Sequence, residues 1–291
     1  MLKLKARAKL NLFLEATRRR PDGYHDLATL FARIGVHDGL SFKKAAPGIR
    51  LKVVGGPAEL GSPEDNIVHK AAVRFFDAFK IRPTVGITLK KNIPVGAGLG
   101  GGSSDGAAAL LGLAKLYKIP RSGFPKLMKI AAAIGSDVAF FLLDEVFAEG
   151  RGRGEKLKVV NHKGRLPHVV LVYPGVPVYT KEVYGNLKVA PAAEIKRRLK
   201  DFSKLSADIK KGTFEPAGAA LFNRLEDPVL PRHRAVREAK ERLAALGADA
   251  ALMSGSGASV FALCSSRARA AAIAAKMRSN KDYRVFLTTF C

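Results

Sequence analysis

The stretch from Pro94 to Asp105, PVGAGLGGGSSD, constrains this chain more than any other part of its sequence. Glycine costs a helix or a strand about 0.5–1 kcal/mol relative to alanine, so a run this rich in glycine does not build a core element. It follows the alternating segment VGITLKK (85–91) and precedes an alanine- and leucine-rich segment. We therefore predict the order strand, glycine loop and helix N-terminus, with Ser103 or Ser104 as the N-cap.

A glycine loop that leads into a helix is a candidate anion site. The first helical turn offers N–H groups without intrahelical partners and a partial positive charge, and glycines let the backbone wrap around an oxyanion. We predict a phosphate-binding loop, with a flexible surface loop as the alternative. The pattern GxxxxGK[ST] fails because no lysine follows the glycines. The letters GAGLGG (96–101) fit GxGxxG but lack the βαβ unit that gives that pattern meaning.

Length and composition place the chain among globular proteins. Its 291 residues, 47% of them hydrophobic and 26% charged, predict one large domain or two ordinary ones. Two cysteines, Cys264 and Cys291, form neither a zinc spacing nor a disulfide framework, so we expect a reducing cytoplasm. The basic N-terminus has only a broken apolar run, which argues against a signal peptide, and no apolar stretch is long enough to span a membrane.

The formal net charge of +25 has two interpretations. One is simply a surface rich in lysine and arginine. The other is a polyanionic partner, which could be nucleic acid, an anionic membrane surface or a phosphorylated small molecule. Charge alone does not choose between them. The basic segment 192–211 is predicted to be a helix with a solvated charged face, with a nucleic-acid surface as the less favoured alternative.

Hydrophobic periodicity predicts an α+β protein with antiparallel strands and helices laid on one face. The predicted strands are 2–6, 39–44, 49–54, 85–91, 168–173, 259–264 and 283–289. The predicted helices follow Asn66 and Ser103 or cover 124–134, 192–211, 232–246 and 266–278. A segment rich in glycine and charge at 150–166 predicts a boundary, which gives domains 1–160 and 161–291.

Three segments together resemble the motifs of the GHMP kinases, the superfamily of galactokinase, homoserine kinase and mevalonate kinase. The glycine loop is similar to the motif P-x-x-x-G-L-G-S-S-A. The segments ARAKLNLFL (6–14) and MSGSGASVFAL (253–263) agree with the other two motifs in order and position. The three span nearly the whole chain, so the resemblance is specific.

Further segments resemble one branch of this superfamily, which phosphorylates the 2-hydroxyl of 4-diphosphocytidyl-2-C-methyl-D-erythritol in non-mevalonate isoprenoid synthesis. The loop variant GLGGGSSD carries an extra glycine. The other segments are RRPDGYHDLATLF (19–31), GSDVAFF (135–141), GRGE (152–155), PGVPVYT (174–180) and FNRLEDPVL (222–230).

The resemblance implies a two-domain GHMP-kinase fold. Its N-terminal, ATP-binding domain would be ribosomal-protein-S5-like, and its C-terminal domain would be ferredoxin-like. It also implies ATP and Mg²⁺ as cofactors. We assign no metal-ligating residue, because magnesium binds mainly through substrate phosphates. The residues implied to bind the nucleotide are those of the glycine loop: Pro94, Val95, Gly96, Ala97, Gly98, Leu99, Gly100, Gly101, Gly102, Ser103 and Ser104.

The resemblance also implies a catalytic pair. Asp137 would accept the hydroxyl proton as general base, and Lys9 would keep it ionised and steady the charge of the transferring phosphoryl group. From the residues alone, a lysine on the polar face of a strand and an aspartate that caps a helix beside Ser136 remain the alternatives. Asp105 is the competing carboxylate, which we interpret as structural.

Recognition of the cytosine is implied for Tyr24 and His25, since an imidazole supplies a donor and an acceptor while aromatic rings stack on a base. Tyr184 is the candidate for a second stacking ring, with an ordinary half-buried tyrosine as the alternative. Asn11 and, less strongly, Thr180 are candidates to hydrogen-bond the substrate.

These inferences predict a small-molecule partner, a cytidine-diphosphate-linked alcohol, and neither a nucleic-acid nor a membrane partner. The superfamily contains monomers and homodimers, and the sequence does not choose between them. Two other functions stay open. One is a GHMP kinase for another alcohol, such as homoserine or a mevalonate derivative. The other is a basic RNA-binding protein, which would leave the three motifs unexplained.

Overall fold

The computed structural model describes residues 1–56, 62 and 64–291 of the chain, which form two compact units. Unit 1 comprises Met1–Ala8, Val36–Val95 and Gly100–Asp144. Unit 2 comprises Lys9–Gly35, Gly96–Leu99 and Glu145–Cys291. Both units are discontinuous in sequence, whereas the predicted domains, 1–160 and 161–291, are continuous. That domain boundary stays a prediction.

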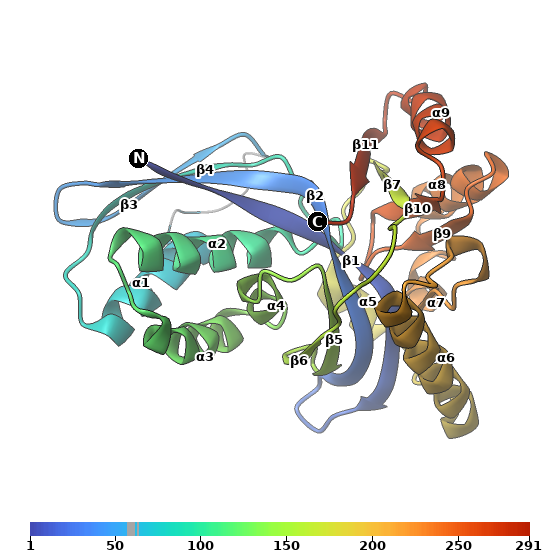
Figure 1. Cartoon of the computed structure of the whole chain (residues 1–291), viewed down its shortest axis with the longest axis horizontal. Coiled ribbons are helices and arrows are strands. Elements are labelled where there is room, and N and C mark those ends of the chain that lie inside the picture. The colour runs from blue at the N-terminus through green and yellow to red at the C-terminus, as the bar shows by residue number, and fades with distance from the viewer. Residues whose placement is uncertain (57–61, 63) are drawn as a thin grey trace. The chain divides into compact units, whose positions relative to one another are not determined.

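Unit 1 combines a sheet with a group of helices (Figure 1). Strand β3 (Gly48–Val54) runs parallel to β4 (Thr84–Lys90), and β4 pairs antiparallel with residues 39–44 of β2 (His25–Lys44). Helix α1 (Ile67–Phe79) packs against α2 (Gly101–Leu116) and α3 (Phe124–Ile134), and α2 packs against α4 (Val138–Leu142). As predicted, α1 follows Asn66, whose side chain accepts a hydrogen bond from the N–H of Val68.

Unit 2 contains an antiparallel four-stranded sheet in the order β11-β7-β10-β9. Helices α8 and α9 pack on these strands. The order β7, α8, β9, β10, α9, β11 is the ferredoxin-like pattern. The bounds of the elements are β7 (His168–Tyr173), α8 (Arg234–Ala245), β9 (Ala250–Met253), β10 (Val260–Cys264), α9 (Arg267–Arg278) and β11 (Arg284–Thr289).

The remaining strands of unit 2 surround the part of β1 and β2 that belongs to it. Strand β5 (Phe147–Gly152) pairs antiparallel with residues 27–32 of β2 and with β6 (Lys156–Val159). Strand β1 (Leu2–Arg19) pairs parallel with β8 (Phe222–Asn223). Helices α5 (Thr180–Gly185), α6 (Ala192–Lys211) and α7 (Glu226–Val229) lie between β7 and α8 in the sequence.

The predicted α+β class is confirmed. Helices α3 and α6 have the predicted bounds, and β7 coincides with the predicted strand 168–173. Strands β1 and β2 are much longer than predicted. Every residue of β1 from Ala8 to Ala16 is buried, including Lys9, Asn11 and Glu15, so this part of the strand has no solvated face.

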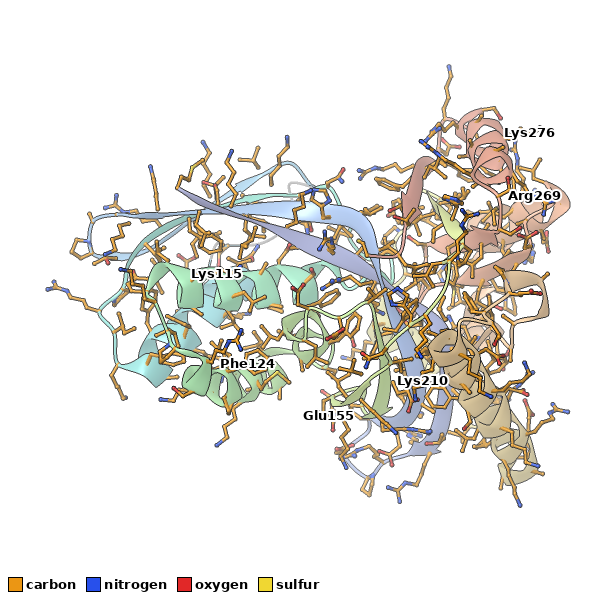
Figure 2. The ribbon with its side chains drawn as sticks, in the orientation of Figure 1. Lys115, Phe124, Glu155, Lys210, Arg269 and Lys276 are labelled. Atoms are coloured by element: carbon orange, nitrogen blue, oxygen red, sulfur yellow. The ribbon has the colours of Figure 1, made fainter. Side chains whose placement is uncertain are left out.

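The basic helix α6 has the solvated face that its sequence predicts. It buries Phe202, Leu205, Ser206 and Ile209, and its lysines and arginines lie outside this face. Elsewhere, Lys115, Arg269 and Lys276 are exposed, and Figure 2 shows their side chains leaving the ribbon. Among the described residues, no helix combines the length and the apolar character needed to cross a membrane.

Candidate active site

The N-terminus of α2 begins earlier than the sequence suggested. The helix starts at Gly101, and its N-cap is Gly100, which has φ +67° and makes no side-chain capping hydrogen bond. The prediction of Ser103 or Ser104 as N-cap is therefore wrong. Glycine takes a left-handed backbone without strain, so the chain turns into the helix at Gly100. The first turn keeps its N–H groups for an anion, as a phosphate cradle requires.

The middle of the glycine loop, Gly96–Leu99, is held by the turn SGSGAS (254–259) within unit 2. The N–H groups of Ala258 and Ser259 donate to the carbonyl oxygens of Gly96 and Ala97, at 3.3 and 3.1 Å. The Ser254 hydroxyl donates to the Gly98 carbonyl at 3.2 Å. The third motif thus lies beside the loop.

Lys9 is buried in β1, where its ammonium belongs to a chain of hydrogen bonds. Its side chain donates to Oδ1 of Asn11 at 2.6 Å, and Nδ2 of Asn11 donates to Oγ1 of Thr29 at 2.7 Å. The Thr29 hydroxyl in turn donates to the carbonyl of Phe13 at 2.8 Å, which fixes the orientation of the Asn11 amide. Lys9 is only 5% exposed, so the alternative of a lysine on a solvated strand face does not hold.

The turn that contains Gly255 meets Lys9 and Asn11. A Cβ at Gly255, whose φ is +55°, would lie 3.2 Å from both Lys9 Nζ and Asn11 Oδ1. Two side chains that the sequence analysis missed support this turn. Asn223 Nδ2 donates to the carbonyls of Met253 and Gly255, both at 2.8 Å, and Glu226 accepts from the N–H of Met253. Both residues lie in the segment FNRLEDPVL (222–230), which resembles the family, but the resemblance predicted no role for either of them.

Asp137 belongs to unit 1, where its turn lies near the first turn of α2. Asp137 is half-buried and immediately precedes α4, but its side chain makes no capping hydrogen bond to that helix. A Cβ at Gly135, two residues earlier, would lie 3.8 Å from the Ser103 hydroxyl. Since Lys9 belongs to unit 2, the pairing of Lys9 with Asp137 stays a prediction.

The candidate base-recognition residues meet in unit 2. His25 is 5% exposed, its ring centroid lies 5.5 Å from that of Tyr184, and the two planes are inclined by 31°. Neither ring nitrogen of His25 has a hydrogen-bond partner among the described residues. Burial, followed by the charge of Arg19, lowers the pKa of His25 and favours the neutral imidazole. Such a buried, unpaired imidazole needs an explanation, and a ligand would supply one.

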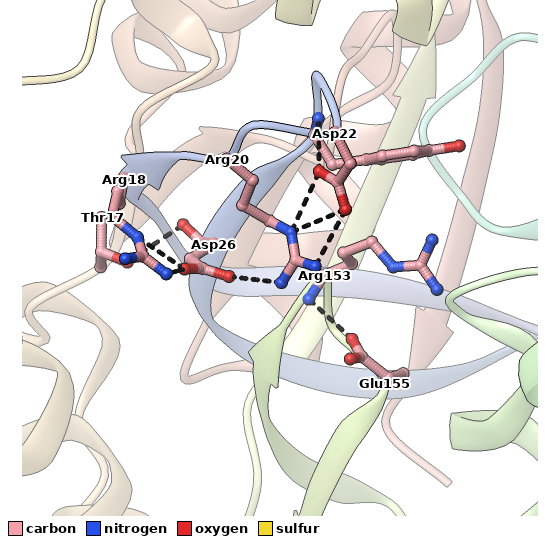
Figure 3. Close-up of polar contacts among 8 residues, drawn as sticks. Thr17, Arg18, Arg20, Asp22, Asp26, Arg153 and Glu155 are labelled. Carbon is pink, nitrogen blue, oxygen red and sulfur yellow. Dashed lines mark hydrogen bonds and ion pairs between the residues drawn. The ribbon is translucent and has the colours of Figure 1, made fainter.

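A network of ion pairs holds the hairpin that carries Tyr24 (Figure 3). Arg20 donates to Asp22 and Asp26, and these hydrogen bonds to the two carboxylates raise its pKa. Asp22 also accepts from the N–H of Tyr24 at 3.2 Å. The Tyr24 ring is 55% exposed, and the guanidinium of Arg153 lies 5.0 Å from its centroid. Arg153 was missed, although its segment GRGE belonged to the resemblance.

Thr180 is exposed at the start of α5. Its hydroxyl lies 2.9 Å from that of Ser256 in the third motif, and the N–H of Val178 donates to the Gly96 carbonyl. The segment PGVPVYT therefore contacts both the loop and the third motif. The first two residues of the glycine loop differ in exposure. Pro94 is buried, whereas Val95 is 43% exposed, and both belong to unit 1.

Asp105 is buried in α2, with a side chain that is 3% exposed, and it accepts a hydrogen bond from Lys91 Nζ at 2.7 Å. The sequence analysis gave no role to Lys91. No group of three or more His, Cys, Asp or Glu side chains suited to a metal ion occurs among residues 1–56, 62 and 64–291.

Comparison with known proteins agrees with this geometry. The signature of the GHMP kinases N terminal domain matches residues 66–145, and that of the GHMP kinases C terminal domain matches residues 205–282. The chain is 41% identical to the 4-diphosphocytidyl-2-C-methyl-D-erythritol kinase of Syntrophus aciditrophicus (strain SB), over 90% of each chain.

Two solved structures extend the comparison. A crystal structure of 4-(cytidine 5'-diphospho)-2C-methyl-D-erythritol kinase is similar with a TM-score of 0.79, 32% identity and complete coverage of both chains. A homoserine kinase from Cytophaga hutchinsonii has a TM-score of 0.73 at 20% identity, covering 100% of this chain and 96% of that one. At 20% identity, the similarity to the homoserine kinase shows a shared fold and nothing more.

Proposed function

We propose the reaction of this protein from its family: the chain belongs to the 4-diphosphocytidyl-2-C-methyl-D-erythritol kinases, a branch of the GHMP kinases, and transfers the γ-phosphate of ATP to the 2-hydroxyl of that cytidylyl alcohol. One observation in the structure supports this substrate most directly. His25 is buried beside the ring of Tyr184, with both ring nitrogens unpaired among the described residues. The donors and acceptors on the edge of a cytosine would give this imidazole the hydrogen bonds it lacks.

The glycine loop and α2 fit a nucleotide triphosphate. Gly96, Gly98 and Gly100 all have positive φ, and α2 opens without a side-chain cap, so backbone N–H groups are available to the phosphates. Magnesium, when bound, neutralises phosphate charge and is held mainly through the phosphates themselves. The loop residues would therefore position the nucleotide and, through it, the ion.

Lys9 and Asp137 carry the remaining chemistry. Asp137 takes the proton of the 2-hydroxyl as the oxygen attacks the γ-phosphorus, and the bond from that phosphorus to the β–γ bridging oxygen breaks. Lys9 stabilises the negative charge that is distributed over the transferring group. Asn11 supports Lys9 by accepting a hydrogen bond of 2.6 Å from its ammonium.

A panel of acceptor alcohols tests the function. With ATP and Mg²⁺, we expect phosphorylation of 4-diphosphocytidyl-2-C-methyl-D-erythritol and little or none of homoserine or mevalonate. Phosphorylation of either of these without any of the cytidylyl alcohol would overturn the assignment. A cytoplasmic location and the state of monomer or homodimer stay predictions.

His25→Ala is expected to raise the KM for the cytidylyl alcohol by about tenfold or more, since an unmade hydrogen bond to a buried group costs about 1–3 kcal/mol. The KM for ATP should change by less than about twofold. Steady-state kinetics with each substrate varied in turn measure both. The matched control is His69→Ala on α1, a half-buried histidine outside the proposed site. An unchanged KM for the alcohol would contradict base recognition by His25.

The same histidine predicts a pH dependence. Because its folded pKa is lowered, the imidazole is neutral at pH 7, and the native state binds fewer protons than the unfolded chain below the ordinary value of about 6.5. The contribution of His25 to stability is thus present above that pH and is lost as the pH falls through the folded pKa. The KM for the alcohol should rise over the same acidic range, and His25→Ala should remove that rise.

A further inference from the structure

One buried cluster of charges in unit 1 connects the two flanks of the glycine loop. Asp38 lies on β2, Lys91 directly follows β4, and Asp105 lies in the second turn of α2. Lys91 therefore precedes the loop and Asp105 follows it. The exposed fractions of the three side chains are 0%, 6% and 3%, respectively.

The contacts within the cluster are direct. Lys91 Nζ donates to Oδ2 of Asp38 and to Oδ2 of Asp105, the latter at 2.7 Å. Oδ1 of Asp38 accepts from the N–H groups of Asn92 and Ile93, at 2.5 and 2.8 Å. Asp38 thus fixes the backbone that enters the loop, and Lys91 links it to the helix that leaves the loop.

The cluster also lies against the start of α2. A Cβ built at Gly101, the first residue of the helix, would lie 3.5 Å from Lys91 Nζ. We propose that Asp38, Lys91 and Asp105 form a clasp that positions both flanks of the glycine loop, and that the net charge of this clasp sets the affinity of the loop for nucleotide phosphates. This inference rests on the proposed binding of ATP at the loop.

The charge of the clasp depends on one proton. Burial raises the pKa of Asp105 to about 8, the Lys91 ammonium opposes this rise, and the Asp38 carboxylate adds to it. Burial disfavours the Lys91 ammonium, but the attraction of the two carboxylates outweighs this effect and its pKa is raised. Oδ1 of Asp105 is buried and has no hydrogen-bond partner among the described residues.

Lys91 and Asp38 are the charged groups that act on the pKa of Asp105. The buried residues of α1, α3 and α4, which surround α2, are all apolar. With Asp105 protonated, the Asp38 carboxylate and the Lys91 ammonium cancel. Loss of the proton leaves one net negative charge beneath the helix N-terminus that would receive the phosphates, which weakens anion binding.

The test compares the wild type with Asp105→Asn, which keeps an oxygen for Lys91 and is neutral at every pH. The Kd of a non-hydrolysable ATP analogue with Mg²⁺ is measured by calorimetry between pH 6.5 and 9.5. In the wild type we expect the Kd to rise about three- to tenfold across pH 8, an estimate for one added charge, and in Asp105→Asn we expect no such rise. Equal pH profiles for the two proteins would overturn the electrostatic role.

A second pair of variants tests the clasp itself. Lys91→Met should raise the Kd of the analogue at least about tenfold and lower the melting temperature, because it leaves the buried Asp38 unpaired. The control is Lys90→Met, whose side chain is exposed. An unchanged Kd in Lys91→Met would overturn the positioning role. Both measurements omit the acceptor alcohol, so their failure is distinct from failure of the proposed kinase reaction.

Stability provides an independent readout. Asp105 keeps a proton in the native state that the unfolded chain releases near its ordinary pKa of about 4. The free energy of unfolding should therefore fall as the pH rises from about 4 to about 8. Asp105→Asn should flatten this slope. If Asp105 had only a structural role, Asp105→Asn would change how the free energy of unfolding depends on pH but would leave the pH dependence of the nucleotide Kd unchanged.

Discussion

Asp137→Asn is expected to lower kcat by about 10²–10⁴-fold while the Kd of ATP stays nearly unchanged, because a general base typically contributes that factor and asparagine cannot accept the proton. The substitution keeps the size of the side chain, and the Asp137 side chain does not cap α4, so the helix should persist. Kinetics with the cytidylyl alcohol give kcat, and calorimetry gives the Kd of ATP. A kcat within about threefold of the wild type would exclude Asp137 as the base.

Asp77→Asn is the matched control, since Asp77 is exposed on α1 and lies outside the proposed site. It should leave kcat unchanged. A fall in kcat for this control would indicate that loss of an acidic charge, rather than loss of the base, is responsible.

The pairing of Asp137 with Lys9 is tested by combining Asp137→Asn with Lys9→Met. Residues that act as a unit in catalysis are strongly non-additive, so the double variant should lose little more activity than the more damaged single variant. Multiplicative losses would instead show that the two residues act independently. The result would address the pairing directly, since the two residues belong to different units.

Gly98→Ala is expected to abolish ATP binding and to lower the melting temperature by at least about 5 °C. Gly98 has φ +73°, a conformation that costs an L-residue about 1–2 kcal/mol. The added Cβ would also lie 2.0 Å from the carbonyl oxygen of Ser254, which is far shorter than any van der Waals contact of a carbon atom. The backbone must therefore move, and the hydrogen bonds between the loop and the third motif break.

Gly102→Ala separates this effect from loss of a glycine in general. Gly102 lies in α2 without a positive φ, and its Cβ would meet nothing closer than 3.9 Å. Because alanine is favoured over glycine in a helix by about 1 kcal/mol, its melting temperature should be unchanged or higher. Thermal unfolding of the two variants makes the comparison. An unaltered melting temperature and ATP affinity in Gly98→Ala would contradict the packing described for the loop.

The sequence predicts best where one periodicity dominates. Helix α6 has a single apolar stripe that ends at Gly212, and its bounds were predicted correctly. Strand β5 lies in a segment rich in glycine and charge, so its composition resembled a linker. The N-cap of α2 was misplaced because serine is the usual capping residue, whereas here Gly100 makes the turn.

The sequence predicted those residues of the candidate site that lie in segments resembling the family. Lys9, taken alone, looked like one polar residue on a strand, and only the resemblance pointed to a site. The clasp of Asp38, Lys91 and Asp105 gave no signal, since each is an ordinary charged residue until the fold buries it. Asp38 and Lys91 are 53 residues apart, and only β2 and β4 bring them together.

The exposed ring of Tyr24 makes this protein suitable for an optical assay. The chain contains no tryptophan, so Tyr24→Trp would introduce a single indole whose emission can be excited selectively. Arg153 would remain against that ring, and an indole is the best partner for a cation. A base that stacks on position 24 would quench or shift this emission, and titration would then follow binding of the acceptor without any turnover.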